Sequence, residues 1–210
     1  PGWMPVIGGT QTWQFGGLVS LYNGTGGIAS LLGLLALPWL VNRAGKKSVF
    51  IALFVMSIAS TAAFYFLRPG QIGLIFGLNL AGSITGGPLS ALLWAMYADT
   101  ADFGEWKRGR RATGLIFSAS ILSQKMGWAF GGTLALLLMA GVGFQANAVQ
   151  TPESLHGLVL LMSLIPAAFG LVALVLVACY PLGEARMGRI AAELISRRRA
   201  EYPAEAGVLP

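Results

Sequence analysis

Long apolar stretches alternate with short bursts of charge along the chain. Five stretches stand out, residues 18–41, 48–67, 71–98, 113–144 and 155–180, which together hold one lysine and no other Lys, Arg, Asp or Glu. A helix needs about 20 apolar residues to cross a bilayer, and these runs lack the polar face that a helix keeps on a soluble protein. The pattern predicts an all-α polytopic membrane protein with about five transmembrane helices.

The runs divide the chain into three parts. Residues 1–17 are interrupted by Gly and Pro and are too short to span, so their tryptophans suit an extracytoplasmic or interfacial segment. Residues 18–182 form the predicted transmembrane bundle, and residues 183–210 form a cytoplasmic tail. Within the tail, residues 183–202 predict a basic helix that lies on the membrane surface. Its apolar side carries Ile190, Leu194 and Ile195.

Composition and charge agree with a membrane protein. Hydrophobic residues make up 55% of the chain and charged residues 10%, whereas soluble domains carry about 25% charged residues. The net charge of +6 does not indicate a nucleic-acid partner, because the basic residues lie between the spans and in the tail. Basic groups at 42–47, 107–111 and 186–199 share one side, and the opposite side has only Arg68. The positive-inside rule therefore predicts a multi-pass protein of the inner or plasma membrane with a cytoplasmic C-terminus.

Lys125 is the one charge inside a predicted span. It lies twelve residues beyond Thr113, about 18 Å along a helix, which is near the middle of a hydrocarbon core about 30 Å thick. A charge at that depth costs at least about 2.5–3.5 kcal/mol and normally has a partner. None of the eight acidic residues falls in a predicted span. The partner is therefore a ligand or a carboxylate from outside this chain, unless a tilted helix lets the lysine reach the interface.

Polar and small residues surround Lys125. Ser118 and Gly132 share its stripe at helical spacing, Gln124 lies beside it, and Trp128 follows one turn later. A flat aromatic face with a few hydrogen-bonding groups suits a sugar-sized ligand. Lys125, Gln124 and Trp128 are therefore the candidate substrate-binding residues. Ordinary packing of Trp128, and close helix packing at the glycines, remain alternatives.

The segment DTADFGEWKRGRR, residues 99–111, is the densest cluster of charge. A metal site is disfavoured because no histidine supports the acids and four basic residues crowd them. A loop that only sets topology and a salt-bridged gate between moving halves both fit. The spacing of Asp99 and Asp102 places both on one helical face, where they could meet arginines of another domain.

The sequence holds no arrangement typical of an enzyme. It has no nucleophile–base pair, no metal cluster and no phosphate-binding loop. The single histidine, His156, lies in a predicted outer loop, and the single cysteine, Cys179, lies in an apolar run. We therefore expect neither catalysis nor a cofactor nor a bound metal.

The charged segment resembles a family signature. The run Asp99–x–x–Asp102–Phe103–Gly104–Glu105–Trp106–Lys107–x–Gly109–x–Arg111 is similar to the connection between helices ten and eleven of the glycoside–pentoside–hexuronide:cation symporters. These form the melibiose permease group within the major facilitator superfamily. Lys125 matches the position of that family's lysine in helix eleven. NRAGKK, residues 42–47, and LYNGTGGIASLLG, residues 21–33, resemble its loop between helices eight and nine and its helix eight.

The resemblance covers about residues 18–200 and implies helices eight to twelve of a twelve-helix transporter. It implies symport of a sugar with Na⁺ or H⁺ by a protein whose N-terminal half, which holds the cation-binding aspartates, is missing here. Asp99, Asp102 and Arg111, with Glu105 in the same signature, would join salt bridges between the halves, and Lys125 would line the cavity. One departure is Thr113, where the melibiose permease group has a glutamate.

Two other functions remain open at this point. Lysolipid carriers resemble the same family, and an apolar cavity would distinguish them. A non-transporting membrane subunit would instead need a stable partner surface.

Overall fold

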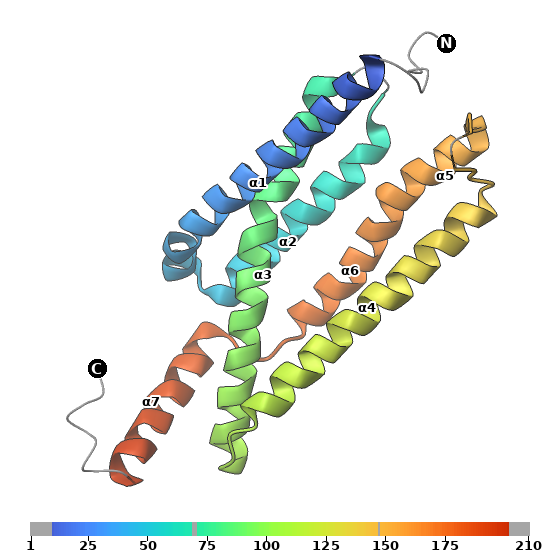
Figure 1. Cartoon of the computed structure of the whole chain (residues 1–210). Coiled ribbons are helices and arrows are strands. Elements are labelled where there is room, and N and C mark those ends of the chain that lie inside the picture. The colour runs from blue at the N-terminus through green and yellow to red at the C-terminus, as the bar shows by residue number, and fades with distance from the viewer. Residues whose placement is uncertain (1–9, 69–70, 147, 202–210) are drawn as a thin grey trace.

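The structure is a computed structural model that describes residues 10–68, 71–146 and 148–201. Figure 1 shows these residues as a bundle of helices, and no strand occurs among them. The elements are α1 (Thr10–Ala44), α2 (Lys46–Ala63), a 3₁₀ turn η1 (Phe64–Phe66), α3 (Ile72–Arg108), α4 (Thr113–Gly141), α5 (Pro152–Met162), α6 (Leu164–Ala178) and α7 (Glu184–Glu201). The prediction of an all-α polytopic fold is confirmed.

Four helical segments in the described residues are long and apolar enough to cross a bilayer: Gly16–Ala44, Lys46–Phe66, Ile72–Arg108 and Pro152–Ala178. They correspond to four of the five predicted spans. Helix α4 has 29 residues but is not among these four, and Gln124, Lys125 and several glycines lie near its middle. It nevertheless runs the length of the bundle, from the end of α3 to the opposite end where α5 begins (Figure 1).

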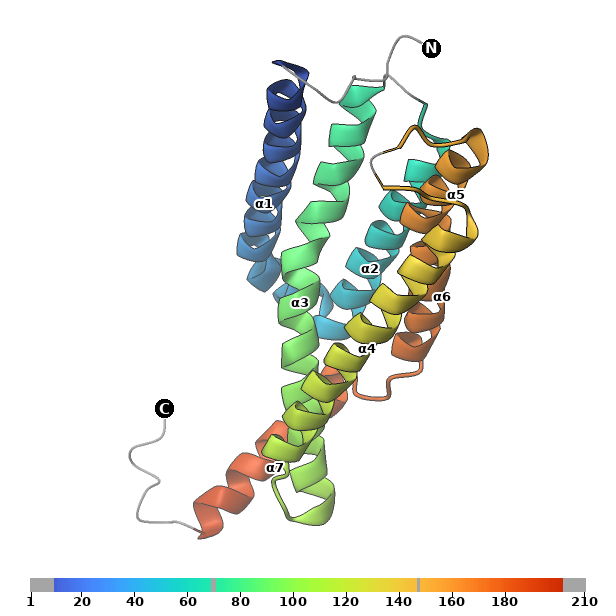
Figure 2. The ribbon, with the colours of Figure 1, turned by 45° about the vertical axis from the view of Figure 1, so that its right-hand side comes forward.

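Helix α3 is the centre of one half of the bundle. It lies between α1 and α2 (Figure 2) and packs along both, while α2 also packs along α6. Buried side chains between these helices include Val49, Phe50, Leu92 and Met96.

Glycines bring α1 and α3 into backbone contact. A Cβ atom at Gly33 of α1 would collide with the carbonyl oxygen of Ile84 in α3. A Cβ at Gly87 of α3 would lie 2.8 Å from the Ser30 hydroxyl of α1 and 2.9 Å from its carbonyl oxygen. Small residues at helix contacts let membrane helices approach this closely.

The last predicted span, residues 155–180, is not one continuous helix. It divides into α5 and α6 at Ser163, whose backbone has φ −125° and ψ −79°. Pro166 follows three residues later. Its ring nitrogen has no hydrogen to donate to the carbonyl one turn earlier, and the ring crowds that turn, so a break at this place has a local cause.

Two predictions at the other end of the bundle were wrong. Residues 99–108 are not a loop but the last turns of α3, which ends at Gly109 with φ 66°. The following connection is therefore short, from Gly109 to Ala112. The tail helix forms as α7, but most of its apolar side does not lie free for a membrane. Ile190 and Leu194 are buried against Phe103 and Trp106 of α3, and only Ile195 of the three predicted apolar residues is exposed.

Candidate functional site

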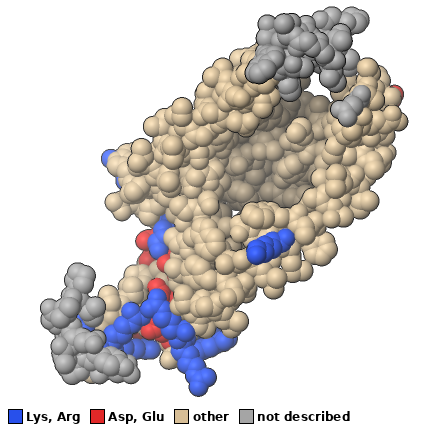
Figure 3. Space-filling model, viewed as in Figure 1, with Lys and Arg blue, Asp and Glu red and all other residues tan. Residues whose placement is uncertain are grey.

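Charged side chains gather at one end of the molecule, which Figure 3 shows beside α7 and the last turns of α3. We call this the charged end, and it comprises the start of α2, residues 99–113, the α6–α7 connection and α7. The elements meet there because α1 and α2 turn sharply at Gly45, which has φ 78°. This turn presents Lys46 and Lys47 to α3 and to the end of α6.

Asp99 is held by Lys46. The Lys46 Nζ donates to both Asp99 carboxylate oxygens, at 2.7 Å and 2.8 Å, and the Asp99 side chain is only 13% exposed. The backbone N–H of Lys46 donates to Glu184 of α7 at 3.1 Å, so a carboxylate lies at the N-terminus of α2, where it is favoured by the helix dipole. Lys47 Nζ donates to the carbonyl oxygens of Ala178, the last residue of α6, and of Tyr180 just beyond it, at 3.0 Å and 2.6 Å.

Arg111 and Arg198 meet the other two acids of the signature. Arg111 lies 3.4 Å from Asp102 and 3.7 Å from Glu105. Arg198 of α7 contacts Glu105 at 2.9 Å. The structure thus joins Asp102, Glu105 and Arg111 in one network with Arg198. Asp99 forms a separate ion pair with Lys46. All four predicted residues therefore have partners from this same chain.

Thr113, where the sequence departs from the melibiose permease group, contacts this network. The Arg111 Nε donates to the Thr113 hydroxyl at 3.1 Å. A neutral acceptor therefore stands where the melibiose permease group has a carboxylate, and the guanidinium keeps two carboxylate partners in Asp102 and Glu105.

Aromatic and arginine contacts fasten α7 to α3. The Trp106 indole N–H donates to Glu193 at 2.6 Å, and Arg197 donates to the Trp106 carbonyl oxygen at 3.2 Å. The Arg186 guanidinium stacks over the Phe103 ring, 5.2 Å from its centroid. Sequence reasoning missed these partners because it treated α7 as a free membrane-surface helix. The spacing Met187, Ile190, Leu194 was the available signal for a buried stripe.

Tyr180, in the connection between α6 and α7, links that connection to α3. Its hydroxyl donates to the Met96 carbonyl oxygen at 3.3 Å and lies 3.4 Å from the Thr100 hydroxyl. Burial raises the pKa of Tyr180 above the ordinary value of 10.0, and the hydrogen bond to Thr100 opposes this in part. The phenol is therefore neutral at physiological pH and remains a donor.

Replacing Tyr180 by phenylalanine is expected to lower the free energy of unfolding by about 0.5–1.5 kcal/mol at neutral pH. Because the folded-state pKa is raised, the tyrosine's advantage is fully present below pH 10 and declines as the pH rises above it. Thermal unfolding of both proteins in detergent at several pH values measures the difference. A difference that grows with pH would contradict the assignment.

The candidate substrate-binding residues lie on α4, and no residue of this helix is buried among the described residues. Lys125 and Gln124 are exposed, and Trp128 is 71% exposed. No carboxylate within the described ranges forms an ion pair with Lys125. The three residues are neighbours along one side of α4, but no other described helix closes a cavity over them.

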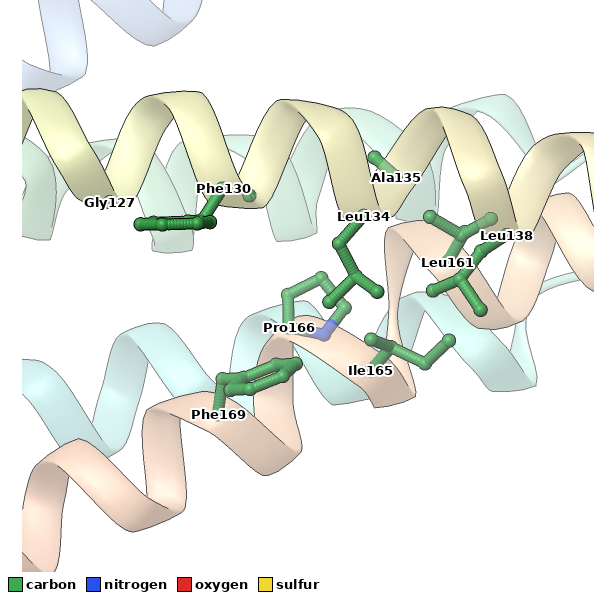
Figure 4. Close-up of a pocket in the computed structure, with 10 residues that line it drawn as sticks. Gly127, Phe130, Leu134, Ala135, Leu138, Leu161, Ile165, Pro166 and Phe169 are labelled. Carbon is green, nitrogen blue, oxygen red and sulfur yellow. The ribbon is translucent and has the colours of Figure 1, made fainter.

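A groove of about 480 Å³ runs between α4 and the α5–α6 pair (Figure 4). Its lining is Gly127, Phe130, Gly131, Leu134, Ala135, Leu138, Leu161, Ile165, Pro166 and Phe169. At about 100° per residue, Gly127 and Leu134 lie on the side of α4 opposite Lys125. The groove therefore offers neither the lysine nor a hydrogen-bonding side chain, and it is not the cavity predicted around Lys125.

The fold and these contacts define a class of protein: a polytopic α-helical membrane protein with an ion-paired end. Residues 9–184 match the profile of a family described as MFS/sugar transport protein. The chain belongs to this family, and its resemblance to the glycoside–pentoside–hexuronide:cation symporters is confirmed.

Curated relatives agree with this membership. The chain is 30% identical to a glucuronide carrier protein homolog of Escherichia coli over 91% of the chain and 41% of the relative. It is 29% identical to a putative glycoside/cation symporter of the same species over 84% of the chain and 38% of the relative. It is 31% identical to an isoprimeverose transporter of Lactiplantibacillus pentosus over 71% of the chain and 32% of the relative. The chain thus spans about two-fifths or less of the length of these relatives.

Proposed function

We propose that the chain is the C-terminal part of a secondary active symporter that moves a sugar-type solute together with Na⁺ or H⁺. The observation that carries this proposal is Lys125, an exposed charge about 18 Å along α4 with no ion pair to the described residues. In a membrane that arrangement is costly unless a watery cavity or a carboxylate covers it. The shared ancestry with glycoside and isoprimeverose carriers supports a sugar-type cargo.

The rest of the transporter would supply what α4 lacks. An N-terminal half packed across the exposed side of α4 would close a cavity over Lys125, Gln124 and Trp128 and place carboxylates near the ammonium. The cation and the sugar would then share one cavity, and two rocking halves would expose it alternately to each side of the membrane. This function uses no catalytic residue, cofactor or structural metal.

The ion network would act as the inner gate in this proposal. Asp102 contacts Arg111 at 3.4 Å, a distance that leaves room for exchange with basic groups of the other half. Asp99, by contrast, is held closely by Lys46. Glu105 is likewise held closely, by Arg198 at 2.9 Å. We therefore assign Asp99 and Glu105 to the internal framework of the gate, and Asp102 and Arg111 to its exchangeable surface.

The test of the function is uptake by the transporter that contains this segment, reconstituted in liposomes. Labelled glucuronides, pentosides and simple glycosides are offered under an inward Na⁺ gradient, an inward H⁺ gradient, or neither. We expect accumulation of one sugar class with one cation and none without a gradient. Uptake of a labelled lysolipid, with no sugar accumulation, would favour the lysolipid carrier instead. Neither uptake would favour a non-transporting subunit.

Topology gives a second prediction. With Cys179 replaced by serine, cysteines at Gly109 and Val149 should react with an impermeant thiol reagent from opposite sides of the membrane. Gly109 lies at the charged end, and Val149, 81% exposed, lies in the α4–α5 connection. The positive-inside rule places Gly109 in the cytoplasm, together with the C-terminus. Labelling of both from one side would overturn the arrangement.

Reversing the charge of Asp99 should lower uptake roughly tenfold, the equivalent of about 1.4 kcal/mol. Asp99→Lys would place two ammonium groups together in a site where the carboxylate is mostly buried. Uptake and cysteine accessibility at the charged end are both measured.

The control is the exchanged pair, Lys46→Asp with Asp99→Lys, which should recover uptake to within about threefold, a difference of less than 1 kcal/mol. Glu153→Lys, an acid near the opposite end, should have little effect. Normal uptake by Asp99→Lys alone would leave the segment with a topological role only.

A further inference from the structure

A second polar feature lies away from both Lys125 and the charged end. A pocket of about 220 Å³ opens between α2 and α3. Its lining is Ser57, Ser60, Thr61, Phe64, Leu78, Asn79, Gly82 and Ser83. Both helices are apolar enough to span a bilayer. Five side chains that can form hydrogen bonds nevertheless gather in this pocket, and their presence there needs a physical explanation.

The pocket lies inside the membrane-spanning region, near the end opposite the charged end. Ser60 is fourteen residues from the start of α2 at Lys46, about 21 Å along the helix, and Asn79 is seven residues from the start of α3 at Ile72, about 10 Å. The α2 segment continues to Phe66, about 9 Å beyond Ser60. Counting along either helix therefore places the pocket about 10 Å below that end of the bundle.

Only part of the polar lining is satisfied by the protein. The Asn79 side-chain N–H donates to the Tyr22 carbonyl oxygen of α1 at 2.8 Å, and Ser83 donates to the Asn79 side-chain oxygen at 3.3 Å. Thr61 donates to the Ser57 carbonyl oxygen at 2.9 Å. Within the described residues, the hydroxyl groups of Ser57 and Ser60 have no hydrogen-bond partner, although Ser60 is only 7% exposed. Hydrocarbon against these groups would leave them unsatisfied at a cost.

The chemistry of the lining defines what the pocket would hold. No Lys, Arg, Asp or Glu contributes to it, so it offers neither compensation for an ion nor a carboxylate for a cation. It offers hydroxyl groups and one carboxamide, which bind neutral molecules that both donate and accept hydrogen bonds. Its volume corresponds to about seven waters at 30 Å³ each.

We propose that this pocket is a hydrated site for neutral hydroxyl compounds, occupied by water and open to a small polyol. Asn79 fixes its floor by tying α3 to α1, Gly82 keeps the two helices close beside Ser60, and the hydroxyl groups of Ser57 and Ser60 face the guest. Its position on α2 and α3 makes it independent of the sugar cavity proposed around α4.

The test uses thiol chemistry, because methanethiosulfonates react with a thiolate, which forms only where water reaches the sulfur. In the Cys179→Ser protein, Ser83→Cys should react with a cationic methanethiosulfonate at least tenfold faster than Leu80→Cys. Leu80 is an exposed apolar position three residues away on the same helix, so it reports contact with lipid. Ser57→Cys provides a second reporter if Ser83→Cys does not fold.

Glycerol tests whether the pocket binds a small polyol or holds water alone. If it slows the labelling of Ser83→Cys more than that of the solvent-exposed Val149→Cys, the pocket binds the polyol; equal slowing means that it holds water alone. Either result supports a hydrated site. Labelling of both Ser83→Cys and Ser57→Cys as slow as that of Leu80→Cys would overturn the proposal and leave dry helix packing. Labelling does not depend on uptake, so this result and the transport result can fail separately.

Discussion

Gly33→Ala is expected to destabilise the bundle by about 3 kcal/mol, near the upper end of the usual cost of overpacking. Gly33 is buried at the contact between α1 and α3, and its missing side chain leaves room for the Ile84 carbonyl oxygen. That neighbour is backbone within a helix and cannot rotate away as a side chain would. The two helices must therefore separate, which also loosens the nearby contact between Gly87 and Ser30. Thermal unfolding in detergent and the amount of protein in the membrane measure the effect.

Gly27→Ala is the matched control for this prediction. Gly27 lies on the same helix, six residues earlier, and a Cβ atom there would meet nothing within 4 Å. Because alanine favours a helix over glycine by up to about 1 kcal/mol, this variant should be neutral or slightly stabilised. Equal stability of the two variants would show that α1 and α3 are not in backbone contact.

The helices could be predicted from the sequence because a bilayer imposes a simple requirement of length and apolarity. The residues at which these helices end could not be predicted. α3 continues through the charged residues 99–108 because its last turns pack against α7 outside the apolar region, and charge alone does not end a helix. The break at Ser163 was equally hidden, since a proline in an apolar run is compatible with a continuous, kinked span.

The candidate site, too, could be predicted from the sequence only in part. The acids of the signature and Lys125 could be found from residue type, depth and spacing. Their partners could not, because Lys46 and Asp99 are 53 positions apart in the chain and Glu105 and Arg198 are 93 apart. The basic residues that form these pairs also satisfied the positive-inside rule, so the sequence offered no reason to give them a second role.

Lys125→Ala is expected to reduce gradient-driven sugar uptake at least tenfold, or about 1.4 kcal/mol, while leaving the amount of protein in the membrane unchanged. The reason for the second part is structural: α4 has no buried residue among those described, so truncating this side chain removes no packing there. The reason for the first is electrostatic. An ammonium near the middle of the bilayer holds its place only through a carboxylate, a ligand or water, and removing it leaves that partner uncompensated.

Three comparisons separate a role in coupling from a role in folding. Lys125→Arg should not restore uptake, because a planar guanidinium cannot occupy the position of a compact ammonium. Leu137→Ala, at a 65% exposed position of the same helix, should behave as the unchanged protein. Sugar exchange across the membrane without a gradient should suffer less than accumulation if the lysine belongs mainly to the cation site. Normal accumulation by Lys125→Ala would mean that the lysine extends to the interface, and the main physical reason for placing the cavity beside α4 would be lost.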